Sequence, residues 1–186
     1  MLDVFYLFWL SELPGVGFQT MQSIMKQIPS IKELYEKKIC VDSLNHIRQS
    51  VKEAIMDDRL RKRACGKWEE MQKKNIRFLS YWGDGYPSRL IPLYQSPNQL
   101  YVRGKLPEED RISIGIVGAR ECTCYGRDMA RWFGFRLAKN GVCVISGMAK
   151  GVDGWAHQGA LEAGGMTCAV LGSGVDVCYP REHEKL

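Results

Sequence analysis

The sequence predicts an α/β fold in which a small all-α helical module precedes the first half of a doubly wound, parallel, Rossmann-like sheet. Short apolar runs recur at residues 112–117, 142–145 and 167–171, and they lack polar alternation, as buried parallel strands do. A stretch with helical spacing of apolar residues lies between each pair of runs. The order strand, helix, strand, helix, strand is that of half a doubly wound sheet.

The beginning of the chain is expected to be helical. Asp3 is placed to cap a first helix that continues through Leu10. Apolar residues lie on nearly all sides of this helix, so the helix should be buried. A Leu-Pro-Gly-Val-Gly turn at residues 13–17 separates it from a second helix at about 18–28. This turn resembles a helix-hairpin-helix element, whose amides hold a DNA phosphate, although a plain helix connection uses the same residues.

Two further helices are expected before residue 76. Ser30 and Glu33 have the spacing of a capping box that opens a third helix. A fourth is expected to start near residues 42–43 and to continue to about residue 75. We therefore expect an N-terminal domain of residues 1–75, of the helix-hairpin-helix or SAM-like kind.

The remaining residues, 76–186, are expected to form the Rossmann-like domain. Residues 76–81 and 100–102 have strand character, and a proline-punctuated connection lies between them. The polar residues 105–110 then lead into the main sheet. Glycines at 141 and 164–165 are placed to end the two connecting helices. The apolar residues of these helices are Met129, Trp132, Phe133 and Leu137 in the first, and Val152, Ala156, Ala160 and Ala163 in the second.

The turns after the three main strands hold the candidate binding residues, because ligands of such sheets lie at the carboxyl ends of the strands. The turns lie at residues 118–120, 146–153 and 172–174, and each contains glycine. Glycine lets backbone amides approach an anion, and the side-chain cations of these turns are Arg120 and Lys150. The pattern indicates phosphate binding.

Each of these residues also has a purely structural explanation. Glycine after a buried strand is needed for the turn itself. Ser146 is placed to cap the next segment, and Asp153 is an acid near a helix N-terminus, where the helix dipole favours it. His157, one turn into that helix, fits a packed or solvated histidine better than a catalytic base.

Over more than sixty residues the sequence resembles the DNA-processing protein A (DprA, or Smf) family, which carries a Gly-Ser-Arg turn and a Ser-Gly-x-Ala-x-Gly-x-Asp segment. They stand here as residues 118–120 and 146–153, and the likeness continues through residues 156–161, 172–176 and 179–180. A weaker likeness at residues 86–87 and 100–104 precedes them. Ala119 departs from the family's more frequent serine, which removes one hydroxyl but leaves the backbone amide and Arg120.

The resemblance implies a protein without catalytic residues that binds single-stranded DNA and helps to load the RecA recombinase in natural transformation. It implies that Arg120 and Lys150 contact the DNA phosphates. It also implies further strands and a self-association surface beyond residue 186, so the domain is expected to be incomplete and a homodimer stays open. The nucleic-acid-binding residues expected on this basis are Gly118, Ala119, Arg120, Ser146, Gly147, Met148, Ala149, Lys150, Gly151, Gly172 and Ser173.

Aromatic residues near the turns are candidates for stacking on DNA bases. They are Tyr125, Trp155 and Tyr179, although core positions fit Trp155 and Tyr179 better than stacking does.

Composition narrows the environment and the partners. The formal net charge is +5, and the excess of positive charge lies between residues 52 and 77. This stretch is either a solvated helical face or an auxiliary nucleic-acid track.

Seven cysteines without a CxxC pair argue against a disulfide framework and favour a reducing cytoplasm. Cys122 and Cys124 lack the neighbours that a metal site requires. The apolar start has no basic residue and no cleavage site of a signal peptide, and no apolar run approaches the roughly 20 residues of a membrane span.

Two enzyme classes share this kind of sheet. An NAD-dependent oxidoreductase requires Gly-x-Gly-x-x-Gly and an acid after the second strand, but Gly115 and Gly118 have the wrong spacing and Ser146-Gly147 ends that strand. A phosphoribohydrolase is the closer alternative, although its Pro-Gly-Gly-x-Gly-Thr-x-x-Glu motif would fall near or beyond residue 186. Asp153 and Asp176 are the acids near the turns, and neither neighbours a nucleophile. No cofactor and no metal are expected.

Overall fold

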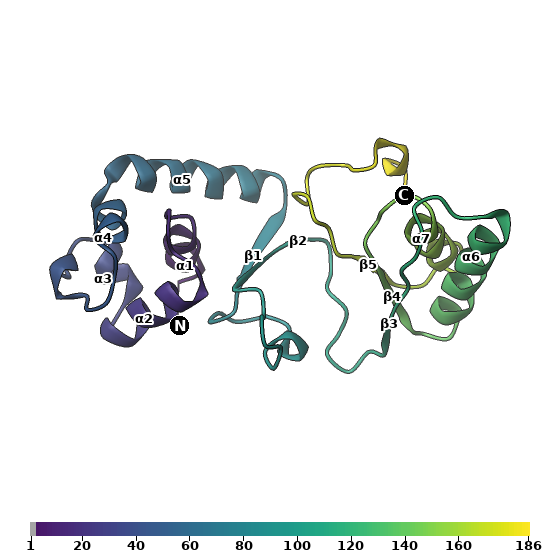
Figure 1. The fold of residues 1–186 in the computed structure, drawn as a ribbon, viewed down its shortest axis with the longest axis horizontal. Coiled ribbons are helices and arrows are strands. Elements are labelled where there is room, and N and C mark those ends of the chain that lie inside the picture. Colours follow the sequence, from purple (N-terminus) through teal and green to yellow (C-terminus); the bar gives the residue numbers. More distant parts are fainter. Residues whose placement is uncertain (1–2) are drawn as a thin grey trace. The chain divides into compact units, whose positions relative to one another are not determined.

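The structure is a computed structural model and describes residues 3–186. It consists of two compact units, Met1–Arg103 and Gly104–Leu186 (Figure 1). The boundary suggested by the sequence, between residues 75 and 76, falls inside the first unit, where its last helix is followed by its first strand.

The first part of the first unit is helical. Its elements are α1 (Val4–Ser11), α2 (Phe18–Gln27), α3 (Ile31–Tyr35), the 3-10 turn η1 (Val41–Ser43), α4 (Gln49–Met56) and α5 (Asp58–Lys73). Asp3 caps α1 as expected, since its side chain accepts a hydrogen bond of 3.1 Å from the Phe5 amide. The predicted bounds of the second helix are confirmed to within one residue.

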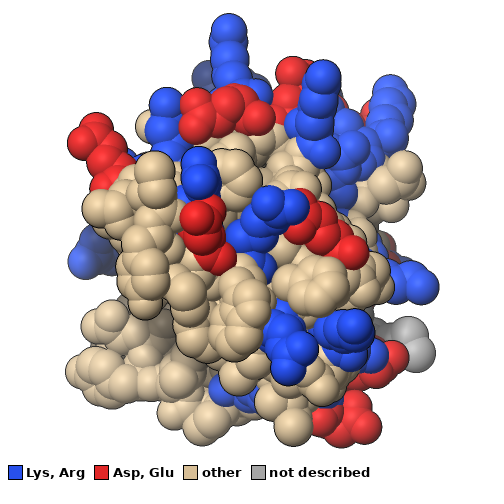
Figure 2. All heavy atoms as spheres, turned by 90° about the vertical axis from the view of Figure 1, so that its right-hand side faces the viewer, with Lys and Arg blue, Asp and Glu red and all other residues tan. Residues whose placement is uncertain are grey.

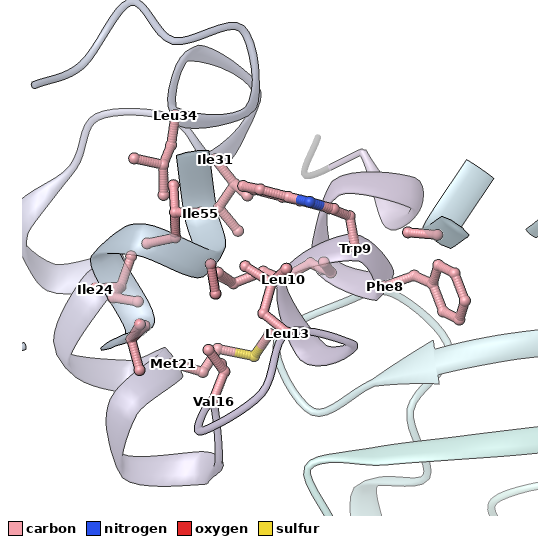
Figure 3. Packing of buried hydrophobic residues seen from close by; sticks show 14 of the residues in the cluster. Phe8, Trp9, Leu10, Leu13, Val16, Met21, Ile24, Ile31, Leu34 and Ile55 are labelled. Atoms are coloured by element: carbon pink, nitrogen blue, oxygen red, sulfur yellow. The ribbon is translucent and has the colours of Figure 1, made fainter. Parts of the chain in front are cut away.

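The core of the first unit forms around α1. Leu7, Phe8, Trp9 and Leu10 are at most 1% exposed, as predicted from the apolar residues on nearly all sides of this helix. Figure 3 shows Trp9 and Leu10 pointing toward residues of the neighbouring helices, among them Ile31. The helical part of the chain therefore has a hydrophobic core of its own.

Two predictions for the third and fourth helices are wrong. Ser30 occupies the N-cap position of α3, but its side chain makes no capping hydrogen bond, so the capping box does not form. The predicted fourth helix is two helices, α4 and α5, and residues 44–48 before α4 are not helical. The break lies at Asp57, which leaves the helical conformation and accepts a hydrogen bond of 2.8 Å from the Arg59 amide. Asp57 thus starts a new helix by capping it.

A β-hairpin completes the first unit and confirms both predicted strands. Strand β1 (Ile76–Ser80) pairs antiparallel with β2 (Gln99–Arg103). The connection between them contains the short 3-10 turn η2 (Ser88–Leu90). Phe78 of β1 packs edge-to-face against Phe8, with 5.3 Å between ring centroids. This contact explains why the hairpin belongs to the helical unit.

The second unit contains the predicted strand-helix repeat. Its elements are β3 (Ser113–Gly115), α6 (Cys124–Lys139), β4 (Cys143–Ser146), α7 (Val152–Glu162), β5 (Thr167–Ala169) and the 3-10 turn η3 (Arg181–His183). The strands form a parallel sheet in the order β3-β4-β5. Gly141 and Gly164 follow the two helices with φ of +79° and +66°, the left-handed conformation of a helix end.

Helices α6 and α7 lie on one side of the sheet (Figure 1) and cross in close contact. A Cβ atom at Gly134 would lie 2.2 Å from the Ala156 carbonyl oxygen, and one at Gly159 would lie 2.0 Å from the Arg131 carbonyl oxygen. The two backbones therefore touch at the crossing. The buried residues of α6 are accordingly small, namely Ala130, Gly134 and Ala138.

The expectation that all three strands are buried on both faces is wrong. Only β4, the central strand, is largely buried, whereas Ile112 and Val117 beside β3 are 68% and 80% exposed and Val170 after β5 is 64% exposed. The reason is that β3 and β5 form the edges of the three-stranded sheet and that both helices cover the same face. Two large side chains of α6 are also outside, since Trp132 is 52% and Phe133 48% exposed, whereas Leu137 packs against the core.

The helices of residues 3–186 are too short or too polar for any of them to cross a membrane.

Candidate nucleic-acid interface

The three glycine-bearing turns follow the carboxyl ends of β3, β4 and β5. Residues 118–120 are exposed, as are Gly147 and Lys150 of the second turn and residues 172–174 of the third. Val170, after β5, donates a hydrogen bond of 2.8 Å from its amide to the Ser146 carbonyl. The third turn therefore begins beside the second.

The first and second turns are interlocked. A Cβ atom at Gly151 would lie 2.2 Å from the Ala119 carbonyl oxygen and 2.4 Å from that of Arg120. Conversely, a Cβ atom at Gly118 would lie 2.7 Å from the Val152 side chain. The Val152 amide donates a hydrogen bond of 3.2 Å to the Ala119 carbonyl. Only glycine permits this approach, and Gly151 also has a φ of +78°.

Asp153 determines the shape of the second turn. Its Oδ2 atom accepts hydrogen bonds from the Gly147 amide at 3.1 Å and from the Ala149 amide at 3.4 Å. The residue is 7% exposed, and Met148 between these amides has a φ of +59°, which is unusual outside glycine. The amides of Gly147 and Ala149 are thus occupied within the protein.

Ser146 acts inside the sheet. It is 3% exposed, and its hydroxyl donates a hydrogen bond of 2.6 Å to the Ile116 carbonyl. In the third turn, Gly172 and Ser173 are exposed, and the Ser173 hydroxyl donates to the Val177 carbonyl at 3.5 Å. The exposed charged side chains of the three turns are therefore those of Arg120 and Lys150.

The two cations differ in their surroundings. Arg120 is exposed, and its side chain has no partner among residues 3–186. Lys150 forms an exposed ion pair of 3.0 Å with Glu182. His183, next to Glu182, lies against the same turn, with its Nδ1 atom 3.0 Å from the Met148 carbonyl oxygen. The 3-10 turn η3 therefore packs on the second turn and holds Lys150.

His157 is a packed histidine, the structural alternative for this residue. It is 1% exposed, and its Nδ1 atom lies 2.6 Å from the Thr167 hydroxyl, which donates in turn to the Val144 carbonyl. Because that hydroxyl proton is used, Nδ1 carries the proton and donates. Burial lowers the pKa of His157, while the charge of Asp153 acts in the opposite direction. The Nε2 atom is buried without a hydrogen-bond partner in the described structure.

The three candidate stacking residues are all exposed, so the core alternative for Trp155 and Tyr179 is wrong. Tyr125 is 75% exposed, Tyr179 67% and Trp155 37%. The Arg127 guanidinium lies over the Trp155 ring, 5.8 Å from its centroid. The sequence interpretation missed Arg127, Glu182 and His183. The signal for Arg127 was its place in the first turn of a helix that begins four residues after Arg120.

Several cations of the charged stretch at residues 52–77 form ion pairs with acids. Lys67 pairs with Glu12, Lys74 pairs with Glu70 at 2.6 Å, and Arg59 pairs with Asp57 at 2.8 Å. These ion pairs favour a solvated face over an auxiliary nucleic-acid track. Figure 2 shows the side of the second unit, and there too Lys and Arg side chains stand among Asp and Glu side chains.

The turn between α1 and α2 has the backbone of a tight helix connection. Gly15 has a φ of +81°, and Leu13 and Val16 are buried beside it. Gly17 occupies the N-cap position of α2 without a side-chain hydrogen bond. A DNA contact at this turn stays a prediction.

Other sites on the described residues are few. No cluster of three or more His, Cys, Asp or Glu residues suited to a metal ion occurs among residues 3–186, and all seven cysteines are free thiols. An open depression of about 580 Å³ lies at the far edge of the sheet from the three turns. Its lining consists of Arg111, Ala138, Lys139, Gly141 and residues 163–166.

Comparisons with known proteins converge on one family. The family model described as DNA recombination-mediator protein A matches residues 77–186. Protein Smf of Escherichia coli is 34% identical over 116 residues, which are 62% of this chain and 31% of that protein. Protein Smf of Synechocystis is 29% identical over 189 residues, which cover 99% of this chain and 47% of that protein. The chain thus spans about half or less of the length of these relatives.

Solved structures agree with the sequence comparisons. The X-ray structure of DNA processing protein A from Streptococcus pneumoniae matches all of this chain and 63% of its own, with a TM-score of 0.72 and 26% identity. A structure of DNA processing protein A from Helicobacter pylori matches 58% of this chain and 47% of its own, with a TM-score of 0.51 and 28% identity. The Helicobacter pylori structure concerns the single-stranded DNA binding mode of that protein. The Rossmann-like fold predicted from the sequence is confirmed by these matches.

Proposed function

We propose that this chain, which belongs to the DNA recombination-mediator protein A family, binds single-stranded DNA at the turns after β3 and β4. The observation that carries the proposal is the interlocking of these turns through Gly118 and Gly151, because it brings two exposed cations to one edge of the sheet. The binding mode named for the Helicobacter pylori relative supports the choice of ligand.

The contacts to DNA are proposed to come mainly from side chains. The Arg120 guanidinium has no partner within the described part of the chain, and its fork shape suits a phosphate. Lys150 has an exposed partner in Glu182, and exposed ion pairs contribute little, so a phosphate displaces that carboxylate at small cost. The amides of Gly147 and Ala149 have little part in binding, because Asp153 occupies them.

The role proposed for the protein is that of a recombination mediator and not of an enzyme that alters the bound strand. Asp153, the acid of the second turn, is buried and accepts two amides, which leaves it unsuited to proton transfer. The finer part of the proposal is that the bound strand is protected and passed to the RecA recombinase in natural transformation. A homodimer and a cytoplasmic location belong to this finer part.

Binding of fluorescent oligo-dT and of its duplex, measured at several salt concentrations, tests the proposal. The matched variants are Arg120→Gln against Arg136→Gln, and Lys150→Gln against Lys139→Gln. Arg136 and Lys139 are exposed cations in the last turns of α6, at the end opposite to the candidate turns. Each variant is first shown to be folded by circular dichroism.

We expect single-strand preference, and a decrease of about 0.7 in the log-log salt slope for each lost phosphate contact in the Arg120 and Lys150 variants only. Unchanged slopes for Arg120→Gln and Lys150→Gln would contradict the site. A folded chain that binds neither oligonucleotide at low salt would contradict the function.

A further inference from the structure

Arg127 and Trp155 form an exposed pair beside the candidate turns. The guanidinium carbon of Arg127 lies 5.8 Å from the centroid of the Trp155 ring. The Arg127 side chain is 44% exposed, and its Nε atom forms an exposed ion pair of 2.9 Å with Asp128; Trp155 is 37% exposed. Trp155 therefore keeps more than a third of its surface in solvent beside a cation, where a ligand can reach it.

The backbone fixes this pair next to Arg120. The Trp155 amide donates a hydrogen bond of 3.2 Å to the Gly151 carbonyl, and Gly151 packs against the Arg120 backbone. On the other side, the Arg127 amide donates a hydrogen bond of 2.9 Å to the carbonyl of Thr123, the cap of α6. Arg127 thus lies in the first turn of α6, which begins four residues after Arg120, and Trp155 lies in the first turn of α7, which begins within the second candidate turn.

We propose that Arg127 and Trp155 form a subsite for one unpaired nucleobase of the strand whose phosphates contact Arg120. This inference rests on the proposed function. An indole ring and a guanidinium both stack on the flat face of any base, so the subsite is tolerant of sequence. In a duplex the base faces are stacked on neighbouring pairs. The subsite therefore contributes to the preference for single strands, which phosphate contacts alone do not provide.

The chain contains an internal comparison for this pair. Arg136 lies over Trp132, also at 5.8 Å, and Trp132 is 52% exposed. This second pair lies further along α6: Arg136 is nine residues beyond Arg127, or roughly 13 Å along the helix axis. It has the same chemistry at a place without the glycine-bearing turns. If an exposed arginine-tryptophan pair were sufficient by itself, the two pairs would behave alike.

The test uses two ligands of equal length and equal phosphate number, oligo-dT and an abasic oligonucleotide. The tryptophan variants are Trp155→Leu, which keeps apolar bulk without a ring, Trp155→Phe, which restores a ring, and Trp132→Leu as the control. We expect Trp155→Leu to weaken oligo-dT binding about tenfold and abasic binding less than about twofold, from the usual strength of base stacking on an aromatic ring. Trp155→Phe should recover most of the affinity, and Trp132→Leu should bind as the wild type does.

The arginine variants test the subsite without altering a ring. Arg127→Gln should weaken oligo-dT binding and reduce its preference over the abasic strand, whereas Arg136→Gln should change neither. Equal effects of the Trp155 and Trp132 variants, or a wild type that binds both ligands equally, would overturn the subsite while leaving the phosphate site intact. Failure of the wild type to bind either ligand would instead refute the proposed function.

Discussion

Replacing Gly134 by alanine tests the close crossing of α6 and α7. Alanine is about 1 kcal/mol more favourable than glycine within a helix, so an exposed position would gain stability. At Gly134 the new Cβ atom would lie 2.2 Å from the Ala156 carbonyl oxygen, whereas ordinary contact begins at 3.4 Å. The helices must separate by about 1 Å, and overpacking of this kind costs about 1–3 kcal/mol.

The oxygen belongs to the backbone of α7, so no side-chain rotation relieves the overlap and the upper part of that range applies. After the gain in helix propensity is subtracted, we expect a net loss of about 2 kcal/mol from the second unit, or about 10 °C in melting temperature for a unit of this size. Gly66→Ala is the matched control. Gly66 lies in the middle of α5, and no atom lies within 4 Å of the place that its Cβ would take, so the same substitution should stabilise the first unit by about 1 kcal/mol.

Hydrogen exchange read separately on peptides of α5, α6 and α7 distinguishes the two units in one experiment. Protection of α6 and α7 should fall in Gly134→Ala, and protection of α5 should rise in Gly66→Ala. A Gly134→Ala protein whose α6 and α7 amides are as protected as those of the wild type would refute the backbone contact between these helices.

Two further predictions concern charge. Glu182→Gln should raise the affinity for oligo-dT about two- to fivefold, which corresponds to the strength of an exposed ion pair, because Lys150 loses the carboxylate that competes with DNA. Glu184→Gln removes the same charge from an exposed neighbouring residue and should bind as the wild type does in the same titration. Because burial lowers the pKa of His157 from its ordinary 6.5, the unfolded chain binds a proton that the folded chain excludes, so the free energy of unfolding should fall as the pH decreases from about 7.5 to about 5.5. Urea midpoints at both pH values should differ less in His157→Gln than in the wild type, and equal differences would contradict this assignment.

Periodicity and turn chemistry predicted most of the fold. Gly141 and Gly164 end the two helices of the second unit, because a left-handed glycine ends a helix whatever its surroundings. Strands β4 and β5 are therefore found in the apolar runs that follow these glycines. The long fourth helix was predicted because its charges continue through residue 57. Aspartate is tolerated inside a helix but strongly favoured at the N-cap position. Tertiary packing decides which of these positions Asp57 takes.

The candidate site was harder to predict because it depends on contacts between distant residues. The sequence indicated Arg120 and Lys150, but it did not indicate that Glu182 pairs with Lys150 or that Arg127 lies over Trp155. Nor does a glycine-rich turn reveal which of its amides are used internally. Here the carboxylate of Asp153, six residues after Gly147, already accepts two of them.

The contact of α6 and α7 through glycine has a consequence for the entropy of association. At the crossing no flexible side chain separates the two backbones, so side-chain rotation there cannot change the distance between the helices. The first turns that carry Arg127 and Trp155 are therefore held in place before any ligand arrives. The protein then orders few torsions on binding, and most of the loss of conformational freedom falls on the flexible nucleotide chain.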